Sequence, residues 1–208
     1  MDKLLSRSIE YDSLLQFNNK NIDYLFLVPW LLVGGADLEA LNYIKAMTDL
    51  HPEKNIIVMA TGLRESTWLD RLPQNVKFLD FGNNFRHIPR EDLDNMLYQY
   101  ILDTKPKVIH NINSASAYRL FINHGKELSK YSNLFVTTFC PDYTKDGKLE
   151  NWTTKYLPDC FEYLSGVFID NKAFIDMLID MFEFDRSKFN VHHQPIKSYG
   201  KNKYENKI

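Results

Sequence analysis

The chain has 208 residues, 44% of them apolar and 14% aromatic, with a formal net charge of -2 at pH 7. This size suits one domain with a substantial core, and the charge argues against a nucleic-acid-binding protein, which usually carries a strongly basic face. The two cysteines lack C-x-x-C spacing, no apolar stretch could span a bilayer and no signal peptide is recognisable, so we expect no disulfide framework, no structural zinc and a cytoplasmic location.

An apolar run over 22–33 leads into Gly34 and Gly35, and apolar residues at helical spacing follow. A run without polar alternation is typical of a strand covered on both faces, as in a parallel sheet. The glycines would let a ligand approach the backbone, and the amino end of the next helix would favour an anion such as a phosphate. Asp37 stands at a plausible cap position. The alternative is that the two glycines only make a packing turn.

Apolar strand patterns and helical patterns alternate through the rest of the chain. Residues 1–21 are interpreted as an amino-terminal extension with a short helix at the domain edge, for which an amphipathic membrane-surface helix is the alternative. Further strands are predicted at 56–60, 76–81, 107–110, 133–140, 163–169 and 190–193, and helices at 68–72, 91–104, 114–128, 152–157 and 171–182.

This alternation predicts a single three-layer α/β/α domain over 22–196, Rossmann-like and doubly wound, with a mostly parallel sheet of about six to seven strands. Residues 197–208 are interpreted as a polar tail or the start of an interdomain linker. Sheets of this kind bind ligands outside the carboxyl ends of their strands, where the strand order reverses. With the usual order 3-2-1-4-5, we expect a crevice lined by the two glycines, by 110–113 and by 140–142.

Several segments on this edge resemble a known family. The stretch Val-Pro-Trp-Leu-Leu-Val-Gly-Gly-Ala-Asp at 28–37 resembles the start of the amino-terminal domain of GT-B glycosyltransferases, in particular retaining enzymes of family 4. Four later segments resemble parts of that domain and occur in the same order as in the family. They are a fourth strand with a histidine-bearing loop, the next strand, a strand-to-helix segment and an exit towards a second domain. These four segments are 106–114, 134–140, 166–174 and 191–196.

The resemblance implies that the domain binds a glycan or lipid-linked acceptor for polysaccharide biosynthesis, while a second domain binds the nucleotide-sugar donor. No metal or other cofactor is implied, and peripheral membrane association is compatible with a lipid-linked acceptor. The Glu-x7-Glu pair of the family's donor domain is absent, because no two glutamates of this chain stand eight positions apart. We therefore expect the chain to be inactive without a partner domain.

The resemblance also assigns roles to individual residues. The backbone N–H groups of Gly34, Gly35 and Ala36 would contact the donor phosphates. His110 and Asp142 are the candidate catalytic residues, with a capping histidine and a solvated loop carboxylate as the alternatives. The candidate acceptor-binding residues, for which surface ion pairing and ordinary turn roles are the alternatives, are Arg64, Asn111, Asn113, Cys140 and Tyr143. Cys140 departs from the family, where many members carry a histidine that bonds the transferred sugar.

Two other functions stay open on the sequence alone. One is a non-catalytic Rossmann-like module that binds a nucleotide or a sugar. The other is a self-contained nucleotide-dependent enzyme, which is disfavoured because neither G-x-G-x-x-G nor G-x-x-x-x-G-K-[ST] is present. His192 and His193 have no third ligand candidate close in sequence, so no metal site is expected.

Overall fold

The computed structural model describes residues 11–16 and 21–195. Residues 11–16 are helical, as expected for the amino-terminal extension. The remainder of that extension and the predicted polar tail at 197–208 lie outside the described residues. None of the described helices is long and apolar enough to cross a bilayer.

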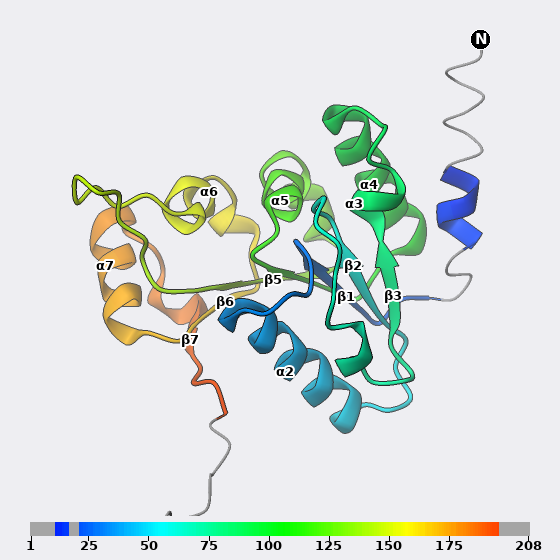
Figure 1. The fold of residues 1–208 in the computed structure, drawn as a ribbon. Helices are drawn as coiled ribbons and strands as arrows, with labels where there is room; N and C mark the ends of the chain where they lie inside the picture. Colours follow the sequence, from blue (N-terminus) through cyan, green and yellow to red (C-terminus); the bar gives the residue numbers. More distant parts are fainter. Residues whose placement is uncertain (1–10, 17–20, 196–208) are drawn as a thin grey trace, which may run out of the picture.

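A seven-stranded sheet forms the centre of the molecule (Figure 1), and every neighbouring pair of strands is parallel. The order β3-β2-β1-β4-β5-β6-β7 contains the predicted order 3-2-1-4-5 and reverses between β1 and β4. The Rossmann-like fold class is therefore confirmed. The strands are β1 (Tyr24–Val28), β2 (Ile56–Ala60), β3 (Lys77–Asp80), β4 (Val108–Ile112), β5 (Asn133–Thr138), β6 (Gly166–Ile169) and β7 (Phe189–Val191).

Helices cover both faces of the sheet. Figure 1 shows α2 below the sheet and α4, α5 and α6 above it, and the apolar side chains of α7 join the same core cluster as those of α4, α5 and α6. The long helices are α2 (Gly35–Leu50), α4 (Arg90–Thr104), α5 (Ala115–Leu128), α6 (Trp152–Cys160) and α7 (Lys172–Phe182). The short elements are α3 (Phe81–Asn84) and the single 3₁₀ turns η1 (Leu69–Arg71), η2 (Phe161–Tyr163) and η3 (Arg186–Lys188).

The apolar run of β1 is explained by burial on both faces. Leu25 and Leu27 belong to the core cluster under α4 to α7, whereas Phe26 and Val28 belong to the cluster under α2. Successive side chains of a strand point to opposite faces, so a strand between two helical layers needs apolar residues at every position. The predicted three-layer arrangement follows from this pattern.

Two local predictions are wrong. The fourth strand does not end at His110 but continues to Ile112, because the polar side chains of His110 and Asn111 find tertiary partners inside the fold. Asp37 is not the cap of α2, since the helix begins at Gly35 and the extended residue Gly34 occupies the cap position without a side-chain hydrogen bond. The predicted cap Ser114 is confirmed, because its hydroxyl accepts from the Ala117 backbone N–H.

Candidate functional site

Three hollows lie next to one another at the carboxyl edge of the sheet. We call them the switch-point crevice (about 50 Å³), the β5 hollow (about 140 Å³) and the arginine cavity (about 540 Å³). They share walls: Trp30 lines the crevice and the cavity, Asn113 lines the crevice and the β5 hollow, and Trp152 lines the β5 hollow and the cavity.

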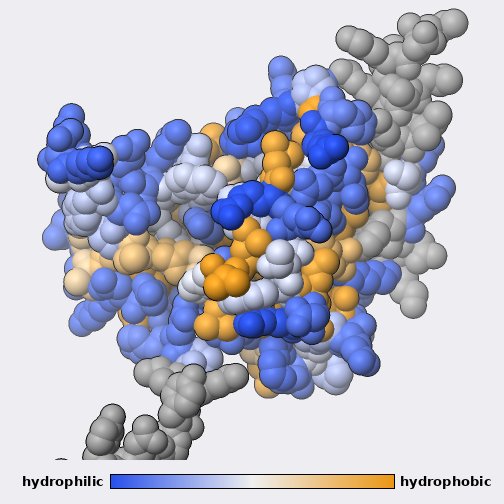
Figure 2. Space-filling model, in the orientation of Figure 1, coloured by the Kyte–Doolittle hydropathy of each residue, from blue (hydrophilic) through white to orange (hydrophobic). Residues whose placement is uncertain are grey.

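The loops after β1 and β2 lie on the face that Figure 2 shows, where strongly hydrophobic groups are surrounded by hydrophilic ones. Two apolar side chains of these loops are strongly exposed, Val33 at 82% and Leu63 at 63%. Both belong to loops at the carboxyl ends of strands. The edge that carries the three hollows is therefore also where apolar side chains reach solvent.

The switch-point crevice lies between β1, β4 and the first turn of α2. Gly35 begins that helix, is exposed, and would have nothing within 4 Å of an added Cβ. The first N–H groups of a helix have no partner within it, so those of Gly35 and Ala36 are free of intrahelical bonds. Ala36 lines the crevice. The predicted phosphate-binding groups thus stand at an open helix amino end, which suits an anion.

Asp37 sits beside these amides and modifies their electrostatics. Its carboxylate accepts from the Leu32 N–H at 3.1 Å and lies within 2.6 Å of where a Cβ on Gly34 would be. Burial raises the pKa of Asp37, while the Leu32 hydrogen bond and the charge of Arg64 act in the opposite direction. A charged Asp37 repels an incoming anion, so an anion at the amino end of α2 would be bound more tightly if a further positive group lay nearby.

His110 lies inside the core instead of at the strand end. Its side chain is 6% exposed and its Nε2 is 2.7 Å from the Thr137 hydroxyl on β5. The rings of Phe26, Tyr43 and Phe168 surround it. Burial lowers the pKa of His110 to about 3, with the nearby His192 contributing in the same direction. The imidazole is therefore neutral at physiological pH, and its polar capacity is used on Thr137.

The two candidate asparagines play different parts. Asn111 is buried, and its Oδ1 accepts from the Ser114 N–H at 2.8 Å, which shapes the start of α5. Among the described residues its Nδ2 has no hydrogen-bond partner. Asn113 has a φ of 60°, in the left-handed region that asparagine tolerates better than most residues. Only Asn113 lines both the crevice and the β5 hollow.

The β5 hollow brings together two other predicted residues. Cys140 is exposed and lines it, as does Asp142. Tyr143 is 58% exposed, pairs with Leu149 as an isolated antiparallel bridge and lines none of the three hollows. Cys140, Asp142 and Asn113 are thus brought to one place, and Tyr143 is not.

The arginine cavity was predicted only through Arg64. Its side chains come from the loops after β1, β2 and β3, from α4 and α5, and from the start of α6. The polar and aromatic residues that give it its chemical character are Trp30, Arg64, Arg86, Arg90, Arg119 and Trp152. Trp30, Arg64 and Arg86 stand in the segments that follow β1, β2 and β3, and segments after parallel strands meet at one edge, but no local pattern singles these residues out.

Close backbone packing holds two of these segments together. A Cβ on Gly82 would lie 1.9 Å from the carbonyl oxygen of Gly62, so the loops after β2 and β3 touch through their backbones. The Asn83 amide also donates to the Arg64 carbonyl at 3.3 Å and to the Asp80 carboxylate. This packing fixes Arg64 and the segment after β3 on one side of the cavity.

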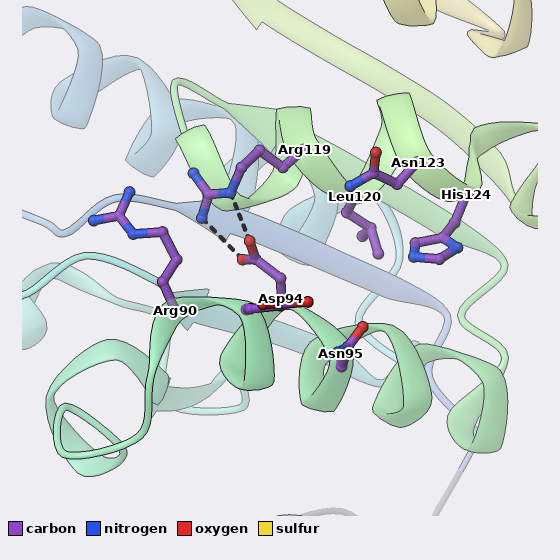
Figure 3. Close-up of a pocket in the computed structure, with 8 residues that line it drawn as sticks. Arg90, Asp94, Asn95, Arg119, Leu120, Asn123 and His124 are labelled. Atoms are coloured by element: carbon purple, nitrogen blue, oxygen red, sulfur yellow. Dashed lines mark hydrogen bonds and ion pairs between the residues drawn. The ribbon is translucent and has the colours of Figure 1, made fainter.

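A groove of about 430 Å³ lies between α4 and α5 and shares Arg90, Asp94 and Arg119 with the arginine cavity; Figure 3 shows residues that line the groove. Arg119 reaches from α5 to Asp94 on α4, with Nε–Oδ2 and Nη2–Oδ1 distances of 2.6 and 2.9 Å. Arg90, at the start of α4, extends to the same side of the groove. The ion pair therefore ties the two helices together where the cavity and the groove meet.

The segment after β7 is attached to the first turns of α2. The Nδ1 of His192 lies 2.7 Å from the carboxylate of the buried Glu39, and the Gln194 amide donates to the Gly35 carbonyl at 3.1 Å. His192 thus pairs with a carboxylate and not with a metal ligand set. Within the described ranges, no group of three or more His, Cys, Asp or Glu residues could hold a metal ion.

Comparison with known proteins gives a fold. Neither a family model nor a curated protein matches the sequence. The lipopolysaccharide outer core galactosyltransferase WaaB has a similar structure, with a TM-score of 0.56 and 15% identity over 83% of this chain and 46% of that one. A glycosyltransferase from Rickettsia africae matches with a TM-score of 0.55 and 14% identity, over 86% and 44%. The fold is that of part of these glycosyltransferases. The chain spans less than half the length of either.

Proposed function

We propose that this chain is the acceptor-side domain of a GT-B glycosyltransferase, of the retaining family 4 type, which transfers a sugar from a nucleotide sugar to a glycan or lipid-linked acceptor. The observation that carries the proposal is the arginine cavity, whose two tryptophans and several arginines lie beside an open helix amino end. A volume of about 540 Å³ is in the range of small-ligand sites. The fold that the chain shares with two glycosyltransferases supports the proposal.

In the proposed reaction the acceptor sugar lies in the arginine cavity, with an apolar ring face on Trp30 or Trp152. The donor is held by a facing domain, and its diphosphate meets the amides of Gly35 and Ala36. These amides stabilise negative charge that grows as the nucleotide leaves, which is the main electrostatic contribution that backbone donors make. The reaction needs no metal or cofactor and takes place in the cytoplasm.

Asp142 is the proposed residue for orienting the acceptor hydroxyl, because it lines the β5 hollow next to the cavity. Asn113 and Cys140 lie in the same hollow and are proposed acceptor contacts. His110 is left out of the proposed chemistry, since its buried ring bonds Thr137 and remains neutral. It holds β4 against β5 beneath the crevice.

A glycan array probed with the 208-residue chain tests acceptor binding without a donor. We expect a defined set of glycans to bind, and free nucleotides to bind weakly. Transfer from radiolabelled nucleotide sugars to these glycans is then measured with the chain alone and with the full-length product of its gene. Tight nucleotide binding without any glycan binding would favour a non-catalytic nucleotide module, and efficient transfer by the 208-residue chain would remove the need for a partner domain.

A further inference from the structure

Positive charge is concentrated in the arginine cavity although the whole chain has a formal net charge of -2. Arg64, Arg86, Arg90 and Arg119 line it, and among its described lining residues Asp94 is the one carboxylate. Clustered like charges repel one another, so a site of this kind is favourable when an anion occupies it. The question is which of the four guanidinium groups are available.

Arg119 and Arg64 already have partners. Arg119 makes the two-bonded ion pair with Asp94, in which both side chains are only partly exposed, so the two charges compensate each other. The Arg64 guanidinium lies 5.0 Å from the centre of the Trp30 ring. A cation above an indole is held in place without losing its charge. Arg64 therefore remains able to attract an anion.

Arg86 and Arg90 have no ion-pair partner among the described residues, and both side chains are exposed. They flank residues 87–89, which contain the buried Ile88, another lining residue of the cavity. Their uncompensated charges are thus held at the rim of one hollow by the chain between β3 and α4. Two other exposed arginines of the described part of the chain differ, since Arg186 pairs with Asp176 and Arg71 stacks on Trp68.

The number of available guanidinium groups favours a phosphate over a carboxylate. A carboxylate has one charge and two oxygens, which a single arginine fork can satisfy. A phosphate monoester carries about 1.5 to 2 negative charges at pH 7 and has three acceptor oxygens. Two free arginines with Arg64 nearby match the larger charge, and arginine binds phosphate in a bidentate manner.

We propose that the acceptor carries a phosphate group that binds Arg86 and Arg90, while a sugar of the same molecule packs on Trp30 and Trp152. This inference rests on the proposed function, because it names the acceptor class of that site. The phosphate could be a substituent on a glycan or the diphosphate that links a sugar to a lipid carrier. The adjoining groove between α4 and α5 is lined mainly by polar side chains, among them Asn95, Asn123 and His124, which suits a continuing glycan.

The test compares phosphorylated glycans with the same glycans after phosphatase treatment, on one array, with the 208-residue chain. We expect binding to the phosphorylated glycans to be at least about 10-fold tighter, because a hydrogen-bonded charge pair contributes about one such factor. A sugar linked through diphosphate to a short prenyl chain forms a separate arm. Preferential binding to that arm assigns the phosphate to a lipid carrier. Preferential binding to glycans that lose affinity after phosphatase treatment assigns the phosphate to the glycan.

The variant R86Q/R90Q should lose the preference for phosphate and keep the affinity for the dephosphorylated glycans. R71Q is the matched control, since it removes an exposed arginine that does not line the cavity. Thermal melting confirms that each variant folds. If the wild-type chain binds treated and untreated glycans equally, or if R86Q/R90Q retains the preference, the inference is overturned and the proposed function stands. If the wild-type chain binds no glycan at all, the proposed function falls and the inference falls with it.

Discussion

The two sides of the carboxyl edge offer ligand-binding groups of different kinds. At the start of α2 the groups are backbone amides of Gly35 and Ala36, and the charged side chain in the same helical turn is the carboxylate of Asp37. In the arginine cavity the groups are side chains from separate segments of the chain. Backbone amides can bind a negatively charged group, but they cannot distinguish one anion from another by side-chain chemistry. The second side can be specific, which is why we propose it as the site of acceptor selection.

The largest expected effect concerns the backbone side. Gly35→Val in the full-length gene product should lower kcat about 10²- to 10³-fold if the amide contacts the donor phosphates. Stability should change little, because Gly35 is exposed, has no positive φ and has open space around an added Cβ. Transfer assays and thermal melting measure the two quantities separately.

Gly147→Ala is the matched control for that variant. Gly147 has a φ of 74° in the loop after β5 and lines none of the three hollows, so a side chain there should cost about 1 kcal/mol of stability without changing kcat. Full activity of a stable Gly35→Val variant would show that the two glycines only make a turn, and the comparison between the two sides would collapse.

The next effect concerns the side-chain side. Trp30→Ala should raise the acceptor KM about 10- to 100-fold, since truncation of a tryptophan that anchors a ligand removes roughly 2 kcal/mol or more of binding. The donor KM should change much less. Trp68→Ala is the control, because Trp68 also lies under an arginine, with Arg71 3.8 Å from its ring centre, but lines none of the hollows. Equal effects of the two variants would argue against an acceptor in the arginine cavity.

A smaller expected effect concerns the pH dependence of stability, and it tests whether His110 belongs to the core or to the crevice. Unfolded histidine binds a proton below about pH 6.5, whereas folded His110 does so only near pH 3, so its contribution to stability is lost as the pH falls through this window. The loss reaches at most about 1.4 kcal/mol per pH unit. His110→Gln should flatten the dependence of the unfolding free energy on pH by this amount, as measured by denaturant titration. A stable His110→Gln variant that loses transfer at pH 7 would return His110 to the catalytic residues.

The smallest effect tests the wall between the two sides. Asn113→Gly should change stability by less than about 1 kcal/mol, because glycine adopts a φ of 60° readily. If the Asn113 amide binds the acceptor, KM should nevertheless rise about 10-fold, the value of one or two hydrogen bonds. Unchanged kinetics would assign Asn113 a purely conformational role at the turn between β4 and α5.

The fold could be predicted because each buried strand is a local signal. An unbroken apolar run such as 24–28, followed by glycine or asparagine and a helical pattern, needs no knowledge of distant residues. The end of β4 could not be predicted in this way. His110 and Asn111 look like the polar end of a strand, and only Thr137, 27 residues later, and the turn at Ser114 explain why they are buried.

The candidate site also contains one part with a local sequence signal and one part that depends on tertiary structure. Gly34 and Gly35 are visible in the sequence because a turn between a strand and a helix needs particular residues. Arg86 and Arg90 carry no local pattern, and they meet Arg64 only because β3 lies beside β2 and the chain then crosses to the other face in α4. Side-chain sites assembled from several loops are therefore the part that a single sequence conceals.

The contacts of the segment after β7 have a mechanical consequence. His192 is joined to Glu39 and Gln194 to the Gly35 carbonyl, both within the first two turns of α2. A displacement of Gln194 would reach Gly35 directly through its hydrogen bond, and one of His192 would reach Glu39, without passing through the sheet. The orientation of the two amides at the head of α2 is thus coupled to the position of residues 192–194.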